Sequence, residues 1–128
     1  MRKRRGRKQF DGDDPFADIA SNLSRLVEPV LLYLLATGRA HYGYQLMEEA
    51  AHFAITDAHI DAAVIYRTLR VLEQNGLVNS SWAPGAGGPA RRLYEVTPAG
   101  IAHLKRWAKV LDQRGRAMTY FAQLCSEL

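Results

Sequence analysis

Residues 61–76 read Asp-Ala-Ala-Val-Ile-Tyr-Arg-Thr-Leu-Arg-Val-Leu-Glu-Gln-Asn-Gly. This stretch predicts one amphipathic helix, because Asp61 is typical of a helix N-cap and Gly76 of the position just past a helix end. At about 100° per residue, one stripe of the helix is apolar and is expected to face a core. The stripe consists of Ile65, Leu69 and Leu72.

The opposite face of this helix carries side chains that suit a DNA major groove. It presents Arg67, Arg70 and Gln74, with the small Ala63 near its N-terminal end. Arginine can donate to O6 and N7 of guanine, and glutamine can bond to N6 and N7 of adenine. Taken alone, such a helix is more simply interpreted as an ordinary surface helix with a solvated polar face. Evidence for DNA binding must therefore come from the rest of the chain.

Composition describes a globular protein of one domain with appendages: 128 residues, 48% hydrophobic and 23% charged. The single cysteine excludes an internal disulfide and cysteine-based zinc sites, and it fits a reducing cytoplasm. The longest apolar run is too short to span a bilayer. No carboxylate pair, nucleophile set or histidine cluster indicates catalysis or metal binding. We therefore predict a cytoplasmic protein that is not an enzyme, needs no cofactor or metal, and does not bind membranes.

Charge is concentrated at the N-terminus, where residues 1–8 hold six Lys and Arg and residues 11–18 hold four Asp. Residues 1–18 therefore predict a disordered arm. The arm is either a DNA-binding extension that follows phosphates or the minor groove, or a solubilising tail. We expect residues 19–97 to form a winged helix-turn-helix domain and residues 98–128 to form a dimerisation helix.

Two helices are predicted before the arginine-bearing one. The first runs from about Ile19 to Gly38, with Pro29 either in the first turn of a helix that begins near Glu28 or at a kink. Its run Val30–Leu35 has no polar side, so we expect a partner chain to cover part of it. The second, from about Tyr42 to Phe53, precedes an irregular connection over residues 54–60. This order is that of a helix-turn-helix.

A β-hairpin is predicted next, with strands at Leu77–Trp82 and Arg92–Val96 and a tip rich in glycine and proline at residues 83–90. A hairpin directly after a recognition helix is a wing. We expect Arg91 and Arg92, where the tip rejoins the sheet, to contact DNA phosphates. Trp82 is expected to pack at the base of the wing.

The last helix is predicted to begin with Thr97 as N-cap and Pro98 in the first turn. Its apolar stripe is too long for one winged domain to cover, so we interpret it as a dimerisation helix rather than one folded back on its own domain. The interface is expected to combine two leucines of the first helix with this stripe. The expected residues are Leu31, Leu34, Leu104, Trp107, Leu111, Met118 and Phe121.

The order of motifs resembles the PadR family of bacterial transcriptional regulators over roughly residues 26–112. The matching pieces are Tyr42–Leu46, Ile65–Glu73, Gly76–Val78 and, most specific, Arg91–Gly100. The resemblance implies a homodimer that binds a palindromic operator, usually as a repressor, and releases it when an effector arrives. The single C-terminal helix is similar to the short subgroup, in which flat aromatic compounds bind between subunits. That implies a small aromatic effector near Trp107 and Leu111. Trp107 itself is expected to be plain dimer core rather than a pocket wall, because an aromatic residue at helical spacing usually packs.

The sequence thus predicts a mainly α fold with a small β-hairpin, a winged helix-turn-helix plus a dimerisation helix. It predicts a DNA-binding regulator, with Tyr66 contacting either a base or a phosphate. Two alternatives stay open: a winged-helix adaptor for another protein, and a ligand sensor whose arginines are neutralised by neighbouring carboxylates.

Overall fold

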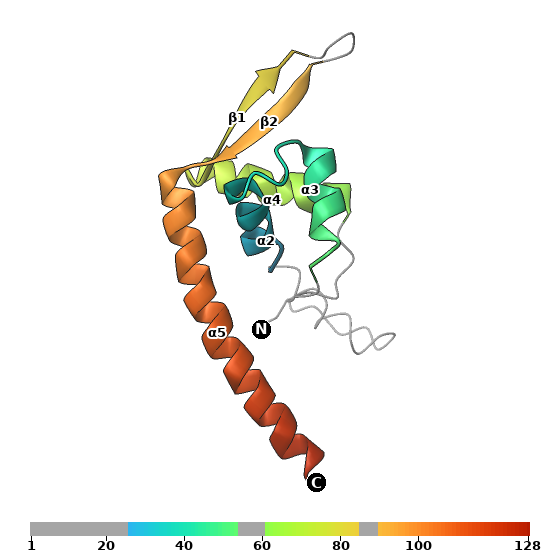
Figure 1. Ribbon diagram of the computed structural model, residues 1–128, viewed down its shortest axis with the longest axis vertical. Coiled ribbons are helices and arrows are strands. Elements are labelled where there is room, and N and C mark those ends of the chain that lie inside the picture. The colour runs from blue at the N-terminus through green and yellow to red at the C-terminus, as the bar shows by residue number, and fades with distance from the viewer. Residues whose placement is uncertain (1–25, 54–60, 85–89) are drawn as a thin grey trace, which may run out of the picture.

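The computed structural model describes residues 26–53, 61–84 and 90–128. Within these ranges the chain forms helices and one antiparallel two-stranded hairpin (Figure 1). In chain order the elements are α2 (Val27–Ala36), α3 (Gly43–Ala50), α4 (Ala62–Gln74), β1 (Val78–Ala83), β2 (Arg91–Val96) and α5 (Pro98–Ser126). The mainly α fold with a small hairpin is confirmed. The predicted arm, the connection over residues 54–60 and the centre of the hairpin tip lie outside the described residues.

Helix α4 has the predicted ends and the predicted buried stripe. The Asp61 side chain accepts a hydrogen bond from the Val64 backbone N–H at 3.0 Å, which satisfies one free donor of the first turn. Gly76 follows the helix with a φ of +73°, a left-handed conformation that costs glycine little. The buried stripe is at most 1% exposed and consists of Ile65, Leu69 and Leu72.

Helix α2 is the centre of the core, and its cover comes from its own chain. Leu31, Leu32 and Leu34 are 0% exposed, because α3, α4, β2 and α5 all pack around this helix. The expectation that a second chain must cover α2 is therefore wrong. Only Tyr33 in the apolar run is exposed, at 40%. The helix has Pro29 in its first turn, in agreement with the later of the two predicted starts.

Helix α3 is capped by the side chain of a residue in its own first turn. Gln45 Oε1 accepts hydrogen bonds from the backbone N–H groups of His41 and Tyr42, at 3.0 and 3.1 Å. The segment before the helix also pairs with the hairpin. The Tyr94 N–H donates to the His41 carbonyl at 2.8 Å, and an isolated bridge joins Tyr42 to Leu93. The entry to α3 and the wing are therefore fixed to each other.

The hairpin strands pair in a continuous register from Val78 opposite Val96 to Ala83 opposite Arg91. Val78 and Tyr94 point into the core, at 0% and 7% exposure. The predicted strands are correct to within one residue. The predicted packing of Trp82 is wrong: it lies at the tip end of the ladder, beyond the reach of the core, and is 64% exposed.

Helix α5 begins as predicted and then leaves the domain. The Thr97 hydroxyl accepts from the Gly100 N–H at 3.0 Å and donates to the Gly76 carbonyl at 2.8 Å, and Pro98 is the first helical residue. The first turns pack on α2 and β2. The helix has 29 residues, which at 1.5 Å per residue is about 43 Å. Its distal half projects away from the other elements (Figure 1), and residues 116–128 are all exposed.

Candidate nucleic-acid interface

The outer face of α4 presents the side chains that the sequence singled out for DNA. All of them are exposed: Ala63, Tyr66, Arg67, Arg70 and Gln74. Within the described residues, neither Arg67 nor Arg70 makes an ion pair or a hydrogen bond. Two guanidinium groups therefore stand one turn apart, and neither forms an ion pair with a carboxylate of the described residues, although Arg70 lines a cleft together with Glu73. The electrostatics of this face favour a polyanion.

Tyr66 extends this face toward the N-terminus of α3. Its ring is 45% exposed, and its phenol end lies against the backbone of Gly43. A Cβ at position 43 would overlap the Tyr66 ring, so a glycine is required for this contact. The contact between α3 and α4 therefore holds the phenol at the edge of the polar face.

A polar cleft of about 300 Å³ separates α4 from the wing. It is lined by Tyr66, Arg70, Glu73, Arg92 and Tyr94. Burial raises the pKa of the Tyr94 phenol above its ordinary value, although the Arg92 charge opposes this rise. The Tyr94 hydroxyl thus stays protonated at neutral pH and can donate a hydrogen bond.

Arg92 is held on the side of the wing that faces α4. Its Nη2 lies 3.8 Å from Glu73 Oε1, and its Nε donates to Ser80 Oγ at 3.0 Å. The Ser80 hydroxyl in turn donates to Glu73 Oε2 at 2.7 Å. The guanidinium also lies over the Trp82 ring, 5.3 Å from its centroid. Arg92 is therefore positioned, and its charge is partly compensated by Glu73.

Arg91 is on the opposite face of β2 and contacts the entry to α3. Its Nη1 donates to the Tyr44 hydroxyl at 3.0 Å, and its guanidinium lies 5.5 Å from the Tyr44 ring centroid and 5.8 Å from that of Tyr42. The two rings are stacked, with 7° between their planes. Unlike Arg92, Arg91 has no carboxylate partner within the described residues.

Sequence reasoning missed two residues of this surface, Tyr44 and Glu73. Tyr44 was visible only as part of the motif Tyr42-Gly43-Tyr44, and its link to Arg91 spans 47 positions. Glu73 was treated as part of a family motif, although a carboxylate one helical turn from Arg70 could have been noticed. The structure joins these residues to the predicted set: Glu73 pairs with Arg92 on the side of the wing that faces α4, and Tyr44 contacts Arg91 on the other side.

A protein-family model described as the transcriptional regulator PadR-like family matches residues 31–106. The chain belongs to the PadR-like family of transcriptional regulators. The matched residues include α2 from Leu31 onward, the helix-turn-helix, the wing and the first turns of α5. The PadR-type assignment from sequence motifs is thereby confirmed, and it agrees with the prediction that the chain is not an enzyme.

Individual relatives agree with this assignment. A probable transcriptional regulator from Mycobacterium tuberculosis is 40% identical over 60 residues, which is 43% of this chain. The match spans only about a third of that relative, 32% of its length. A PadR-like regulator from Bacillus cereus has a similar solved structure, with a TM-score of 0.65, 20% identity, and coverage of 80% of this chain and 97% of that one. For a transcriptional regulator from Clostridium thermocellum the TM-score is 0.67 at 23% identity, with 82% and 95% coverage.

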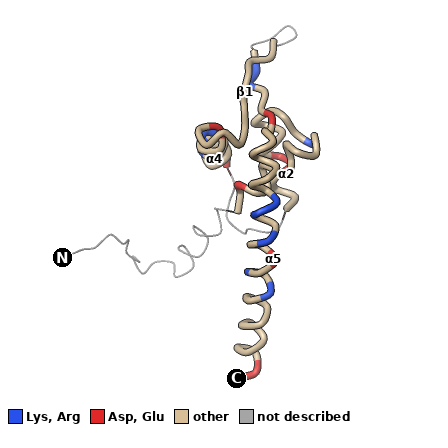
Figure 2. Tube along the Cα trace, turned by 90° about the vertical axis from the view of Figure 1, so that its left-hand side faces the viewer, with Lys and Arg blue, Asp and Glu red and all other residues tan. Residues whose placement is uncertain are grey.

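The side chains expected at a PadR-type dimer interface fall into three groups. Leu31 and Leu34 are 0% exposed within one chain, so they have no surface to offer a partner and that expectation is corrected. The residues nearest the domain, Leu104, Trp107 and Leu111, are half-buried. Met118 and Phe121 are 61% and 65% exposed. They lie in the distal part of α5, which Figure 2 shows free of Lys and Arg.

Two features are absent from the described residues. No helix among them is both long and apolar enough to cross a membrane. Across residues 26–53, 61–84 and 90–128, no group of three or more His, Cys, Asp or Glu is arranged to hold a metal ion.

Proposed function

We propose that this PadR-type regulator is a homodimeric, sequence-specific repressor that an effector releases from a palindromic operator. The observation that carries the proposal is the exposed face of α4, where Arg67 and Arg70 have no compensating carboxylate among the described residues. In a ligand sensor without DNA binding, these charges would be neutralised by neighbours. Among the described arginines of α4 and the wing, Arg92 is the one paired with a carboxylate, that of Glu73.

In the proposed complex, α4 lies in the major groove, and its N-terminal end, which carries Ala63, is closest to the bases. The small side chain lets the N-terminal end of the helix approach the bases. Arg67 and Arg70 read guanine edges, and Gln74 reads an adenine edge. Tyr66, at the margin of the face, contacts a base or a phosphate.

The wing contributes phosphate contacts that position the helix without reading sequence. Arg91 is the stronger candidate, because the Tyr44 hydroxyl holds it and no described carboxylate competes for it. Arg92 reaches phosphates on the side of the wing that faces α4, in competition with Glu73. Residues 1–18, with their basic run, add non-specific affinity or act only as a solubilising tail.

Self-association is proposed through α5. Beyond Arg116 the helix has no charged residue until Glu127, and its large apolar side chains are exposed. Exposed apolar surface of this kind is typical of a protein interface. Met118 and Phe121 would form the distal contacts, and Leu104, Trp107 and Leu111 the proximal ones. A two-fold dimer would then present its two α4 helices to major grooves about 34 Å apart.

The proposed effector site is a cleft of about 200 Å³ beside α5, lined only by apolar side chains. The lining residues are Pro29, Val30, Tyr33, Phe53, Leu104 and Leu111. The Tyr33 and Phe53 rings meet edge to face, with centroids 5.7 Å apart. A flat aromatic compound suits such a wall, and the α5 of a second chain would close the cleft above it.

The decisive experiment is binding by fluorescence anisotropy to a duplex from the DNA upstream of the protein's own gene, against a shuffled duplex. The wild type is expected to prefer the upstream duplex. Arg67→Ala should cost about 1–3 kcal/mol on that duplex and reduce the preference at one base pair. If the wild type binds both duplexes equally, or neither, the repressor proposal fails. Sedimentation of Leu111→Glu tests the dimer: this variant should be monomeric.

A further inference from the structure

We propose that Glu28 is a positioning residue that fixes the direction of α5 relative to the winged domain, and thereby sets the half-site spacing that the dimer accepts. The inference rests on the proposed function for its second part, because spacing has meaning only for a DNA-bound dimer. Its first part, the fixed direction of α5, stands on the geometry of one chain.

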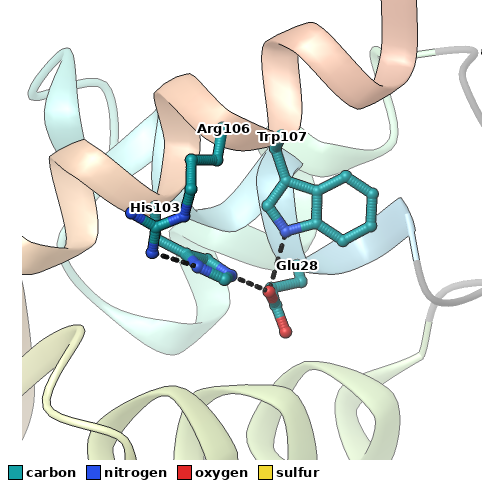
Figure 3. A network of polar contacts seen from close by, with 4 residues as sticks. All are labelled: Glu28, His103, Arg106 and Trp107. Carbon is teal, nitrogen blue, oxygen red and sulfur yellow. Dashed lines mark hydrogen bonds and ion pairs between the residues drawn. The ribbon is translucent and has the colours of Figure 1, made fainter. Parts of the chain in front are cut away.

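The Glu28 carboxylate joins the first turn of α2 to two successive turns of α5 (Figure 3). Its Oε1 atom accepts a hydrogen bond from the Trp107 indole N–H at 2.8 Å and lies 2.8 Å from His103 Nε2. Arg106 Nη2 lies 3.3 Å from His103 Nδ1. A ring with its proton on Nε2 donates to Glu28 Oε1 and accepts from Arg106 at Nδ1. Two α5 side chains, His103 and Trp107, therefore converge on one carboxylate oxygen, and Arg106 contacts the network through His103.

These hydrogen bonds supply what the apolar contacts of α5 lack, which is direction. Apolar burial is non-directional, whereas a hydrogen bond weakens steeply as its angle departs from linearity. The carboxylate is partly shielded from water, with side-chain exposures of 26% for Glu28 and 30% for His103. The network therefore resists rotation and tilt of α5 at a place where Leu104 and Leu111 would tolerate sliding.

The geometry of α5 amplifies any looseness at this network. The helix is anchored near its start, where Gly100 meets the Leu77 carbonyl so closely that no Cβ would fit. At 1.5 Å per residue, Trp107 lies about 10 Å and Ser126 about 39 Å from that anchor. A displacement of about 1 Å at Trp107 thus becomes about 4 Å at the end of α5.

This displacement is as large as one step along DNA. Base pairs rise about 3.4 Å along the duplex axis, so a change of spacing by one base pair moves a half-site by about the amount that a loosened α5 permits. With Glu28 in place, the dimer should accept one spacing. Without it, the preference for that spacing should weaken; it should not vanish, because each added base pair also turns the half-site by about 34–36° around the duplex axis.

The direction of α5 can be measured without DNA. Spin labels at Arg39→Cys and Glu127→Cys, in a Cys125→Ser background diluted with unlabelled protein, report a distance within one chain. The distance distribution should be narrow in the otherwise unchanged protein and in Glu28→Gln, whose amide oxygen still accepts both N–H groups. It should broaden in Glu28→Ala. Glu48→Ala, which removes an exposed carboxylate of α3 outside the network, is the matched control and should leave the distribution narrow.

The preference for one half-site spacing is then measured as the ratio of two affinities. One is the affinity for the preferred operator, and the other is for an operator with one base pair added between its half-sites. The ratio should fall toward 1 in Glu28→Ala and keep its wild-type value in Glu28→Gln and Glu48→Ala. Should Glu28→Ala lose its helical circular dichroism, Trp107→Phe replaces it, because this change removes one N–H and keeps a ring. A narrow distribution in Glu28→Ala, or in Trp107→Phe where it replaces Glu28→Ala, overturns the first part. An unchanged affinity ratio in the same variant overturns the second. A wild type that binds no operator refutes the proposed function alone, since the distance distribution still decides the role of Glu28.

Discussion

Replacing Glu73 by glutamine is expected to tighten binding to every DNA sequence. Glu73 lies in the cleft between α4 and the wing, 3.8 Å from the Arg92 guanidinium, and it is the described carboxylate that competes with phosphate for this arginine. The variant keeps a carbonyl oxygen that can accept from the Ser80 hydroxyl. Arg92 therefore stays in place through its bond to Ser80 and carries an uncompensated charge.

The magnitude follows from the exposure of the pair. The Arg92 and Glu73 side chains are 44% and 35% exposed, so solvent screens them and their interaction is worth at most about 1 kcal/mol. Releasing it should raise affinity at low salt by up to about fivefold. One additional phosphate contact should steepen the dependence of log K on log salt by about 0.9. Between about 50 and 200 mM salt, the variant should then lose about 3.5 times more affinity than the wild type.

The assay is fluorescence anisotropy with the upstream duplex and a shuffled duplex over that range of salt. Glu95→Gln is the control, because it removes an exposed carboxylate from the face of β2 opposite Arg92 and frees no arginine. The steeper slope should appear with both duplexes in Glu73→Gln and be absent in Glu95→Gln. If the two variants have the same slope, Glu73 does not compete with phosphate for Arg92. A gain confined to the upstream duplex would instead make Glu73 a reader of sequence.

Three other changes test the interface and its support. Gly100→Ala should lower the free energy of unfolding by about 1–3 kcal/mol, because its Cβ would overlap the Leu77 carbonyl. Thermal unfolding measures this, and Ala102→Gly at an exposed position calibrates the effect of helix propensity. A stabilised Gly100→Ala variant would contradict the close contact. Thr97→Ala should cost about 1 kcal/mol by removing the α5 cap, measured by urea unfolding, and an unchanged midpoint would show that the cap contributes nothing. Arg91→Ala should reduce the salt slope by about 0.9 with no change in base preference, whereas a changed preference would make Arg91 a reader of bases.

The sequence was sufficient wherever the deciding interactions are local. The N-terminal ends of α4 and α5 follow from Asp61 and Thr97, whose side chains accept hydrogen bonds from N–H groups three residues ahead. The buried stripe of α4 follows from its helical periodicity, and the hairpin from alternation on either side of a glycine-rich tip. Each of these features depends on residues within one turn or one strand, so a pattern in the chain is enough to predict it.

Prediction from the sequence failed where contacts between distant segments determine the structure. The apolar run of α2 indicated a helix covered on several faces, but the run does not say whether the cover comes from this chain or a second one. Trp82 is apolar in a strand, yet its position at the tip end of the ladder leaves it beside Arg92 instead of in the core. The roles of Tyr44 and Glu28 depend on partners 47 and 75 or more positions away. A local sequence pattern does not encode contacts over such separations along the chain.

The cover of α2 by its own chain changes where a second chain can bind. Had Leu31 and Leu34 been exposed, a partner would have completed the core of the winged domain, and the separated chain would have been unstable. With both leucines at 0% exposure, the large exposed apolar side chains of α5 remain, at 61% for Met118 and 65% for Phe121. A partner that binds there is joined to the domain mainly through a long helix, whose direction the contacts around Gly100 and Glu28 must set. In the proposed dimer, the relative position of the two winged domains would therefore be set at the junction between α2 and α5.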